Sequence, residues 1–186
     1  YRNFLFFVNS TNIIDKTRDN FLNPLSIKYL FSPELYLSDR KTRISEVDNF
    51  EAANPNDISI CFTTIQKLHS NLTTQRENAL TFEDFRKHKV ALISDEAHHM
   101  NVATRAQETL HESWENTVEQ IFSQNPENLL LEFTATHDYA TRYSNNSTAA
   151  ATQQRPSRGN RSLISGFNRS GSGNFFSARA APPQEL

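Results

Sequence analysis

Four short apolar runs constrain the fold of this chain most strongly, because each is continuous rather than alternating with polar residues. Each run is rich in β-branched or aromatic side chains. Continuous apolarity over so few residues is typical of a strand buried on both faces, as in a parallel sheet covered by helices. The sequence therefore predicts four buried strands, at residues 4–8, 58–62, 90–93 and 129–133.

Helical patterns separate these runs. The clearest covers residues 104–122, where Leu110, Trp114, Val118 and Ile121 recur every three or four residues. The pair Asn125-Pro126 should end that helix. Strands that alternate with helices predict a doubly wound α/β fold, a parallel sheet flanked by helices. Two shorter helices are predicted at residues 11–22, with Ser10 or Thr11 as N-cap, and at 63–70.

Residues 31–57 fit this alternation less well, because they contain Pro33, Pro55 and many charged residues. Tyr36 and Leu37, followed by the stretch 42–47, predict either a hairpin or a loop excursion.

The chain has two compositions, which divide it into residues 1–136 and 137–186. Residues 1–136 carry 13 Lys or Arg against 19 Asp or Glu, net −6, and residues 137–186 carry 6 against 2, net +4. The second segment is polar, with only isolated apolar residues. Ordering it would cost roughly 1–2 kcal/mol per residue, so we expect a disordered tail. Its arginines suggest electrostatic binding to nucleic acid, and a solvated end without function is the alternative interpretation.

Composition also excludes several classes of protein. The single cysteine, Cys61, cannot form an internal disulfide, which favours a cytoplasmic location. No apolar run approaches the roughly 20 residues that a membrane span needs, and no signal peptide is evident. Because the chain begins with Tyr1, three residues before an apolar run, we expect it to be a piece of a longer protein.

The chemically informative motif is Asp95-Glu96-Ala97-His98, which directly follows the third predicted strand. Acidic residues at the carboxyl end of a buried strand form the Walker B arrangement of nucleotide hydrolases. Successive residues leave a strand in different directions. Asp95 can therefore hold the water shell of Mg²⁺ while Glu96 orients the water that attacks the γ-phosphate, and His98 can sense the nucleotide.

This motif is identical to the DEAH signature of superfamily 2 helicases and translocases. One strand later, Thr134-Ala135-Thr136 resembles motif III of that superfamily. Thr63-Thr64-Ile65-Gln66 resembles its motif Ib, and Asn9-Ser10-Thr11 resembles the motif Ia region. The stretches 4–9, 92–94 and 128–136 further resemble the motor of the type III restriction enzyme Res subunit, so that the resemblance covers residues 1–136.

The resemblance implies a RecA-like fold of the P-loop NTPase type, ATP and Mg²⁺ as cofactors, and double-stranded DNA as substrate. It implies that Glu96 and His98 are catalytic, that Asp95 and Glu96 bind the nucleotide and its Mg²⁺, and that Thr134 and Thr136 couple hydrolysis to movement. It further implies a methyltransferase (Mod) partner and a bacterial cytoplasm. The motif Ia and Ib residues Asn9, Thr11, Thr63 and Thr64 would contact the nucleic-acid backbone.

The chain departs from the family because residues 1–136 contain no glycine, whereas a phosphate-binding loop needs glycines and a lysine. The domain is therefore expected to be incomplete, with an active parent enzyme and an inactive isolated chain. The alternatives are a truncated, non-catalytic nucleic-acid-binding module or remnant, and another superfamily 2 helicase.

Several residues also have other interpretations. Asp95 and Glu96 fit a solvated turn, and Thr134-Ala135-Thr136 fits ordinary strand termination. A metal site would need His98 and His99 together with Asp95, His111 or Cys61, but no familiar ligand spacing is present. Thr63 and Thr64 fit helix capping as well as phosphate binding.

Overall fold

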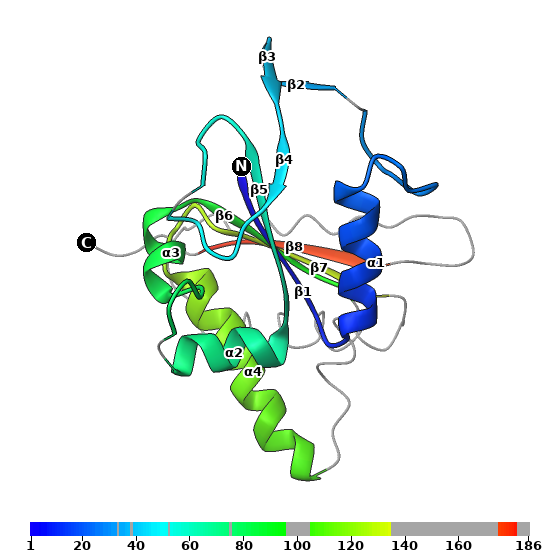
Figure 1. Ribbon diagram of the computed structural model, residues 1–186. Helices are drawn as coiled ribbons and strands as arrows, with labels where there is room; N and C mark the ends of the chain where they lie inside the picture. The colour runs from blue at the N-terminus through cyan, green and yellow to red at the C-terminus, as the bar shows by residue number, and fades with distance from the viewer. Residues whose placement is uncertain are drawn as a thin grey trace.

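The computed structural model describes residues 1–32, 34–37, 39–51, 53–74, 76–95, 105–134 and 175–181 (Figure 1). The side chains of 105–112, 134 and 175–177 are not among those described. The elements in chain order are β1 (Asn3–Val8), α1 (Thr11–Leu22), β2 (Leu35–Leu37), β3 (Arg40–Thr42), β4 (Ile44–Glu46), β5 (Ile58–Thr64), α2 (Ile65–Thr73), α3 (Phe82–Lys87), β6 (Val90–Ser94), α4 (Arg105–Ser123), β7 (Leu129–Thr134) and β8 (Phe175–Ala180).

The four predicted strands form the centre of one sheet, and this confirms the fold class. The sheet has six strands in the order β4-β5-β1-β6-β7-β8. Every neighbouring pair is parallel except β7 and β8. From the central strand β1 the chain goes out to the edge strand β4, and it then returns across the sheet through β5, β6 and β7, so that β1 lies between β5 and β6 as in other doubly wound sheets.

Two hydrophobic cores lie on opposite faces of the sheet. On one face, α1 covers the side chains of Phe6, Val8 and Phe62. On the other face, α2, α3 and α4 cover a larger core that includes Leu5, Leu92 and Leu130. Successive residues of a strand point to opposite faces, so a strand covered on both sides must be apolar throughout. This coverage explains why the four runs show no alternation. Figure 1 shows α1 apart from the other helices.

The predicted helices are present with small shifts at their ends. The helix expected at 63–70 begins at Ile65, because β5 continues to Thr64. Ser10 is the N-cap of α1, but its side chain makes no capping hydrogen bond. Trp114 packs partly buried against the larger core, as its spacing predicted.

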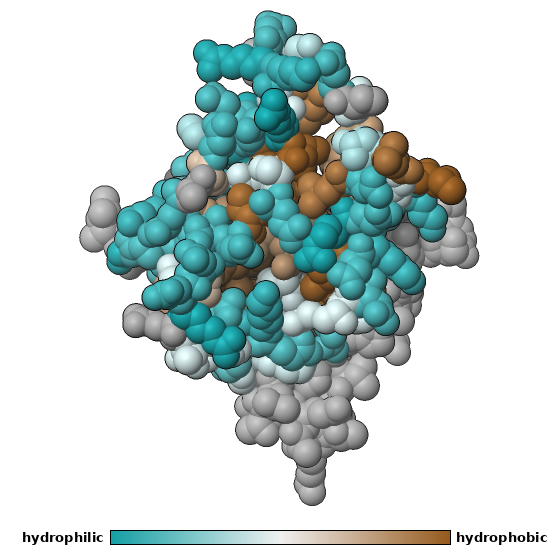
Figure 2. Space-filling view, viewed as in Figure 1, coloured by the Kyte–Doolittle hydropathy of each residue, from teal (hydrophilic) through white to brown (hydrophobic). Residues whose placement is uncertain are grey.

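Residues 31–57 contain both a hairpin and an additional strand. β2 and β3 pair antiparallel as a separate two-stranded sheet. β4 then joins the main sheet by pairing with β5 in parallel. The visible face is mostly hydrophilic in Figure 2, with hydrophobic areas around its centre and at the loop after α1. In that loop Leu25 and Ile27 are 91% and 103% exposed.

Helix α3 is short and was not predicted. It begins with a capping box in which Thr81 and Asp84 bond to each other's backbone. Asp84 is 2% exposed, and its second carboxylate oxygen accepts the Phe50 N–H at 2.9 Å. The carboxylate therefore fixes the loop after β4 to the start of α3.

Strand β8 is an ordered element within the segment that the composition predicted to be disordered. It pairs with β7 over six residue positions, from Leu129 opposite Ala180 to Thr134 opposite Phe175. A strand at a sheet edge is held by main-chain hydrogen bonds, which do not require an apolar run in the sequence. Residues 175–181 are thus an ordered part of the segment expected to be largely disordered, and residues 137–174 and 182–186 lie outside the described part of the chain. Among the described residues, no helix is long and apolar enough to cross a membrane.

Candidate active site at the carboxyl edge of the sheet

The motif residues converge because their strands run parallel and in register. Val8 lies opposite Thr64, Phe7 opposite Ser94, and Ser94 opposite Glu132. The carboxyl ends of β5, β1, β6 and β7 therefore meet along one side of the sheet. We call this the carboxyl edge, and it is defined by Asn9, Thr64, Asp95 and Thr134.

Asp95 is the first residue after β6 and lies half-buried at this edge. Its N–H donates to the Phe7 carbonyl at 3.4 Å, which keeps it beside the end of β1. The polypeptide leaves β1 toward β5 but leaves β6 toward β7. Asp95 thus lies at the switch point of the sheet, which is where open α/β sheets bind their ligands.

Ser94, the last residue of β6, is 1% exposed, and among the described residues its hydroxyl oxygen has no hydrogen-bond partner. Its register neighbour Glu132 on β7 is also buried, at 4% exposure. Near the carboxyl ends of β6 and β7, two interior positions are therefore occupied by polar side chains.

Glu96, His98 and Thr136 lie outside the described residues, as do His99 and Ala97. Thr134 ends β7, two positions beyond Glu132, and its side chain is not among those described. The catalytic and coupling roles expected for these residues therefore stay predictions.

The motif Ia and Ib segments touch directly. The Gln66 side-chain amide donates a hydrogen bond to the Asn9 side-chain oxygen. The Thr64 hydroxyl oxygen accepts the Lys67 N–H at 3.2 Å and so caps α2. Sequence reasoning did not select Gln66 or Lys67 as site residues, although Gln66 belongs to the quoted motif Ib.

Thr63 and Thr64 have different surroundings. Thr63 is 4% exposed, and its hydroxyl donates to the Thr64 carbonyl at 3.2 Å. It therefore supports the end of β5 from inside, whereas Asn9 and Thr11 are exposed at the edge and Thr64 is partly exposed there.

Two helix N-termini open onto the carboxyl edge. α1 begins at Thr11 and α2 at Ile65, and neither has an acidic residue in its first turn. The free N–H groups of a helix N-terminus, together with its dipole, favour an anion. Lys67 is exposed in the first turn of α2 and adds a positive charge. This arrangement suits a phosphate backbone better than a cationic ligand.

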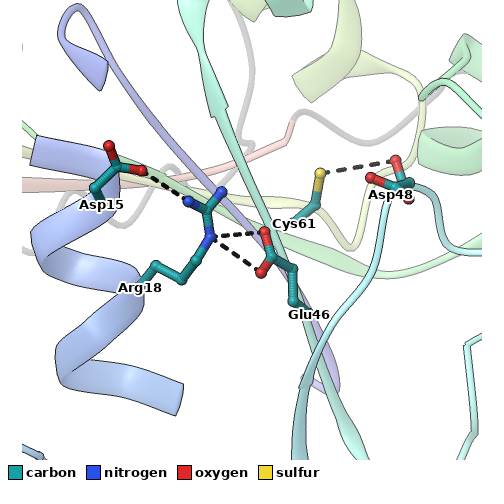
Figure 3. A network of polar contacts seen from close by, with 5 residues as sticks. All are labelled: Asp15, Arg18, Glu46, Asp48 and Cys61. Atoms are coloured by element: carbon teal, nitrogen blue, oxygen red, sulfur yellow. Dashed lines mark hydrogen bonds and ion pairs between the residues drawn. The ribbon is translucent and has the colours of Figure 1, made fainter. Parts of the chain in front are cut away.

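An ion-pair network holds α1 against the sheet (Figure 3). Arg18 Nε donates to both Glu46 carboxylate oxygens at 2.9 and 3.0 Å, and its guanidinium also reaches Asp15 at 2.8 Å. The Arg18 guanidinium lies 5.7 Å from the centre of the Phe62 ring. Because α1 begins at Thr11, this network holds the helix that starts within the motif Ia segment.

Two groups that carry reactive chemistry in other proteins are structural in this chain. Cys61 is buried, and desolvation raises the pKa of its thiol to about 12. His69 on α2 bonds Thr117 on α4 at 2.7 Å and Ser113 at 3.3 Å. The Thr117 hydroxyl already donates to the Ser113 carbonyl at 2.8 Å, so it accepts the proton of His69 Nδ1. His69 therefore joins the two helices.

The metal interpretation finds no support in the described part of the chain, where no three His, Cys, Asp or Glu side chains come together. His98, His99 and the His111 side chain are outside that part. Asp95 supplies one carboxylate at the carboxyl edge, and a single carboxylate is compatible with Mg²⁺, which keeps several waters and takes few protein ligands.

Fold and site together define a RecA-like α/β domain whose polar residues gather at the carboxyl ends of parallel strands. A family model described as "Type III restriction enzyme, res subunit" matches residues 1–138, and the chain belongs to that family.

The chain is 37% identical over 158 residues to the probable type III restriction-modification enzyme HindVIP Res subunit of Haemophilus influenzae. That match covers 73% of this chain but only 30% of the relative. The chain thus spans about a third of the length of this curated relative. No solved structure gives a significant match.

Proposed function

We propose that residues 1–136 form part of the ATP-dependent motor of a type III restriction enzyme, which hydrolyses ATP to move on double-stranded DNA. The observation that carries the proposal is the position of Asp95 at the switch point of the sheet, bonded to the end of β1. Family membership and the DEAH residues support the same assignment.

In this proposal Asp95 holds Mg²⁺ through its water shell, and the metal neutralises charge on the triphosphate. Glu96 orients the attacking water and accepts its proton, which typically contributes 10²- to 10⁴-fold to a rate. His98, Thr134 and Thr136 couple the hydrolysis site to the DNA site. The roles of Asp95 and Glu96 follow from their residue types and their positions after a parallel strand, and the coupling role is the one that the family resemblance implies.

The DNA backbone would lie along Asn9, Thr11 and Thr64, between the N-termini of α1 and α2. Gln66 and Lys67 join this set because Gln66 orients Asn9 and Lys67 supplies charge. Such contacts position a duplex without reading its sequence. Recognition of a target sequence would then belong to other parts of the enzyme, including a methyltransferase (Mod) partner.

This chain alone should not turn over ATP. Its first 158 residues contain no glycine, so they hold no glycine-rich loop to close around phosphates. A non-catalytic nucleic-acid-binding module is therefore the second candidate function for the isolated chain.

The proposal is tested by returning the domain to a complete motor. In the Haemophilus influenzae relative, the matching segment is replaced by residues 1–136 of this chain, and DNA-stimulated phosphate release is measured. We expect turnover by the chimera, and a loss of at least about 100-fold with Glu96→Gln or Asp95→Asn. Glu51→Gln, at an exposed carboxylate, is the matched control and should retain activity.

Two results would contradict the motor proposal. One is a folded, DNA-binding chimera without any turnover. The other is full turnover by the Glu96→Gln chimera. Turnover at the chimera's rate by the isolated chain would refute the expectation that it is inactive.

A further inference from the structure

Strand β8 comes from outside the family domain. The family model ends at residue 138, and β8 begins at Phe175. It also forms the only antiparallel pair within the described part of the main sheet. The outer edge of β7 thus accepts a strand that the rest of the domain does not supply.

The contacts that hold β8 are of two kinds. The first is the main-chain ladder with β7, which depends little on sequence. The second is a specific site for Arg179 on α4. The guanidinium reaches both carboxylate oxygens of Glu119 at 2.9 and 3.1 Å and lies 5.2 Å from the centre of the Phe122 ring.

Little of this segment enters the core. Among its described side chains only Ala181 is buried, at 8% exposure, and the Ala181 N–H donates to the Asn128 carbonyl at 3.2 Å. A ladder, one arginine and one small apolar residue resemble the way an extended peptide binds to a sheet edge.

The connection does not force β8 onto its own molecule. Antiparallel neighbours are commonly joined by two to five residues, but residues 135–174 separate β7 from β8. Forty residues can span at most roughly 130 Å when extended, so the segment can reach a neighbouring copy. β8 would make the same contacts with β7 and α4 whether it docks on its own molecule or on a neighbouring copy.

We propose that the outer edge of β7 is a strand-docking site whose ligand is residues 175–181, and that a second copy of the chain can supply this ligand. Exchange of β8 between two copies gives a closed dimer, in which each Arg179 meets the Glu119 of the other copy. Docking within one molecule dominates when the chain is dilute, because the connection raises the local concentration of the segment.

Two full-length charge-reversal variants distinguish docking of β8 within one molecule from its exchange between two copies. In Glu119→Arg, and equally in Arg179→Glu, docking within the molecule brings like charges together. When the two variants are mixed, docking within a molecule stays unfavourable, but exchange restores an opposite-charge pair at both edges. The double variant, which carries both changes on one chain, restores the pair within one molecule.

Size-exclusion chromatography with light scattering at about 10–500 µM protein provides the measurement. We expect the equimolar mixture to contain at least about fivefold more dimer than either variant alone. The double variant should be monomeric like the unaltered chain at low concentration. A mixture no more dimeric than its components overturns the proposal, and so does equal dimerisation of the double variant.

Cysteine pairing tests the same site without altering charge, should the charge variants fail to fold. Leu131 and Ala178 are register partners, both partly exposed. Leu131→Cys and Ala178→Cys chains are mixed under mild oxidation, with Leu131→Cys and Ala150→Cys as the collision control. A heterodisulfide yield at least about fivefold above the control supports exchange, and a yield equal to the control overturns it.

Discussion

Asn128 is a buried polar residue whose side chain bonds several elements of the fold, so its substitution should destabilise the folded chain. It is 0% exposed, between the end of α4 and the start of β7. Its side-chain oxygen accepts the Val90 N–H at 3.0 Å. Its side-chain amide donates to the carbonyls of Phe85, Ile121 and Phe122 at 3.2, 3.2 and 3.4 Å. One side chain thus joins β6, α3 and α4.

Asn128→Ala would leave the Val90 N–H buried without its partner, at a cost of about 1–3 kcal/mol. The Ile121 carbonyl would keep its bond from the Gln124 N–H at 3.3 Å, so the three carbonyls are not equally affected. Loss of the Phe85 and Phe122 bonds adds about 1 kcal/mol, and the expected total destabilisation is about 2–4 kcal/mol.

Asn128→Asp should destabilise the chain more than alanine at pH 8, because its second carboxylate oxygen faces three carbonyls. Burial and those carbonyls would raise the pKa of the new carboxyl group in the folded state. Its protonated form can donate to a carbonyl. The variant should therefore regain stability as pH falls from 8 to 5, relative to the unaltered chain.

Urea unfolding of the full chain, followed by circular dichroism at pH 5 and pH 8, gives the free energies of unfolding. Asn125→Ala is the matched control, because Asn125 lies in the same loop and makes its bonds near the surface. It should cost less than about 1 kcal/mol. Two results would refute this reasoning. One is a loss of unfolding free energy below about 1 kcal/mol for Asn128→Ala. The other is an Asn128→Asp variant whose stability relative to the unaltered chain does not change with pH.

Three further outcomes follow from the site. Thr64→Val should lower the melting temperature and weaken salt-dependent DNA binding, since it removes the α2 cap, worth about 1 kcal/mol; Thr64→Ser should restore both, and equal binding by all three chains would contradict a backbone contact. A double-mutant cycle with Arg18→Met and Glu46→Gln should give a coupling of about 0.5–1 kcal/mol that falls in 1 M salt, because both side chains are 37% exposed; a salt-independent value would argue against an ion pair. Burial raises the pKa of Cys61 to about 12, so iodoacetamide at pH 8.5 should modify Cys61 only when urea unfolds the chain. Stability should also fall as pH rises above 9, where the unfolded thiol ionises first, and Cys61→Ala should remove that slope.

The strands that could be predicted are those buried on both faces, because such strands need a continuous apolar sequence. β1, β5, β6 and β7 all have continuous apolar runs, and α4 has a clear apolar stripe. Their parallel order then places Asp95 at the carboxyl edge without further information.

The elements that escaped prediction depend on contacts distant in sequence. β8 is held by a ladder and by Arg179, whose partner Glu119 lies 60 residues away. β4 is mostly exposed, so its sequence contains no apolar run that would indicate a strand. α3 could have been found from its capping box, Thr81 with Asp84, but the bond from Phe50 to Asp84 could not.

The candidate site was predictable in its residue types and less so in its geometry. Thr63 and Thr64 are adjacent in one motif, yet only the second lies at the surface, because a strand sends neighbouring side chains to opposite faces. The link from Gln66 to Asn9 joins two motifs through the pairing of β1 with β5, which motif spacing alone does not specify.

The most direct test of the central claim asks where the metal lies. In the chimeric motor, Fe²⁺ replaces Mg²⁺ in the presence of ATP, and ascorbate with peroxide then cleaves the backbone near the bound metal. Mass spectrometry should find ATP-dependent cleavage at residues 94–97, and Asp95→Asn should abolish it. Cleavage confined to other segments, or unchanged by the Asp95 substitution, would contradict a nucleotide site at the carboxyl edge of this sheet.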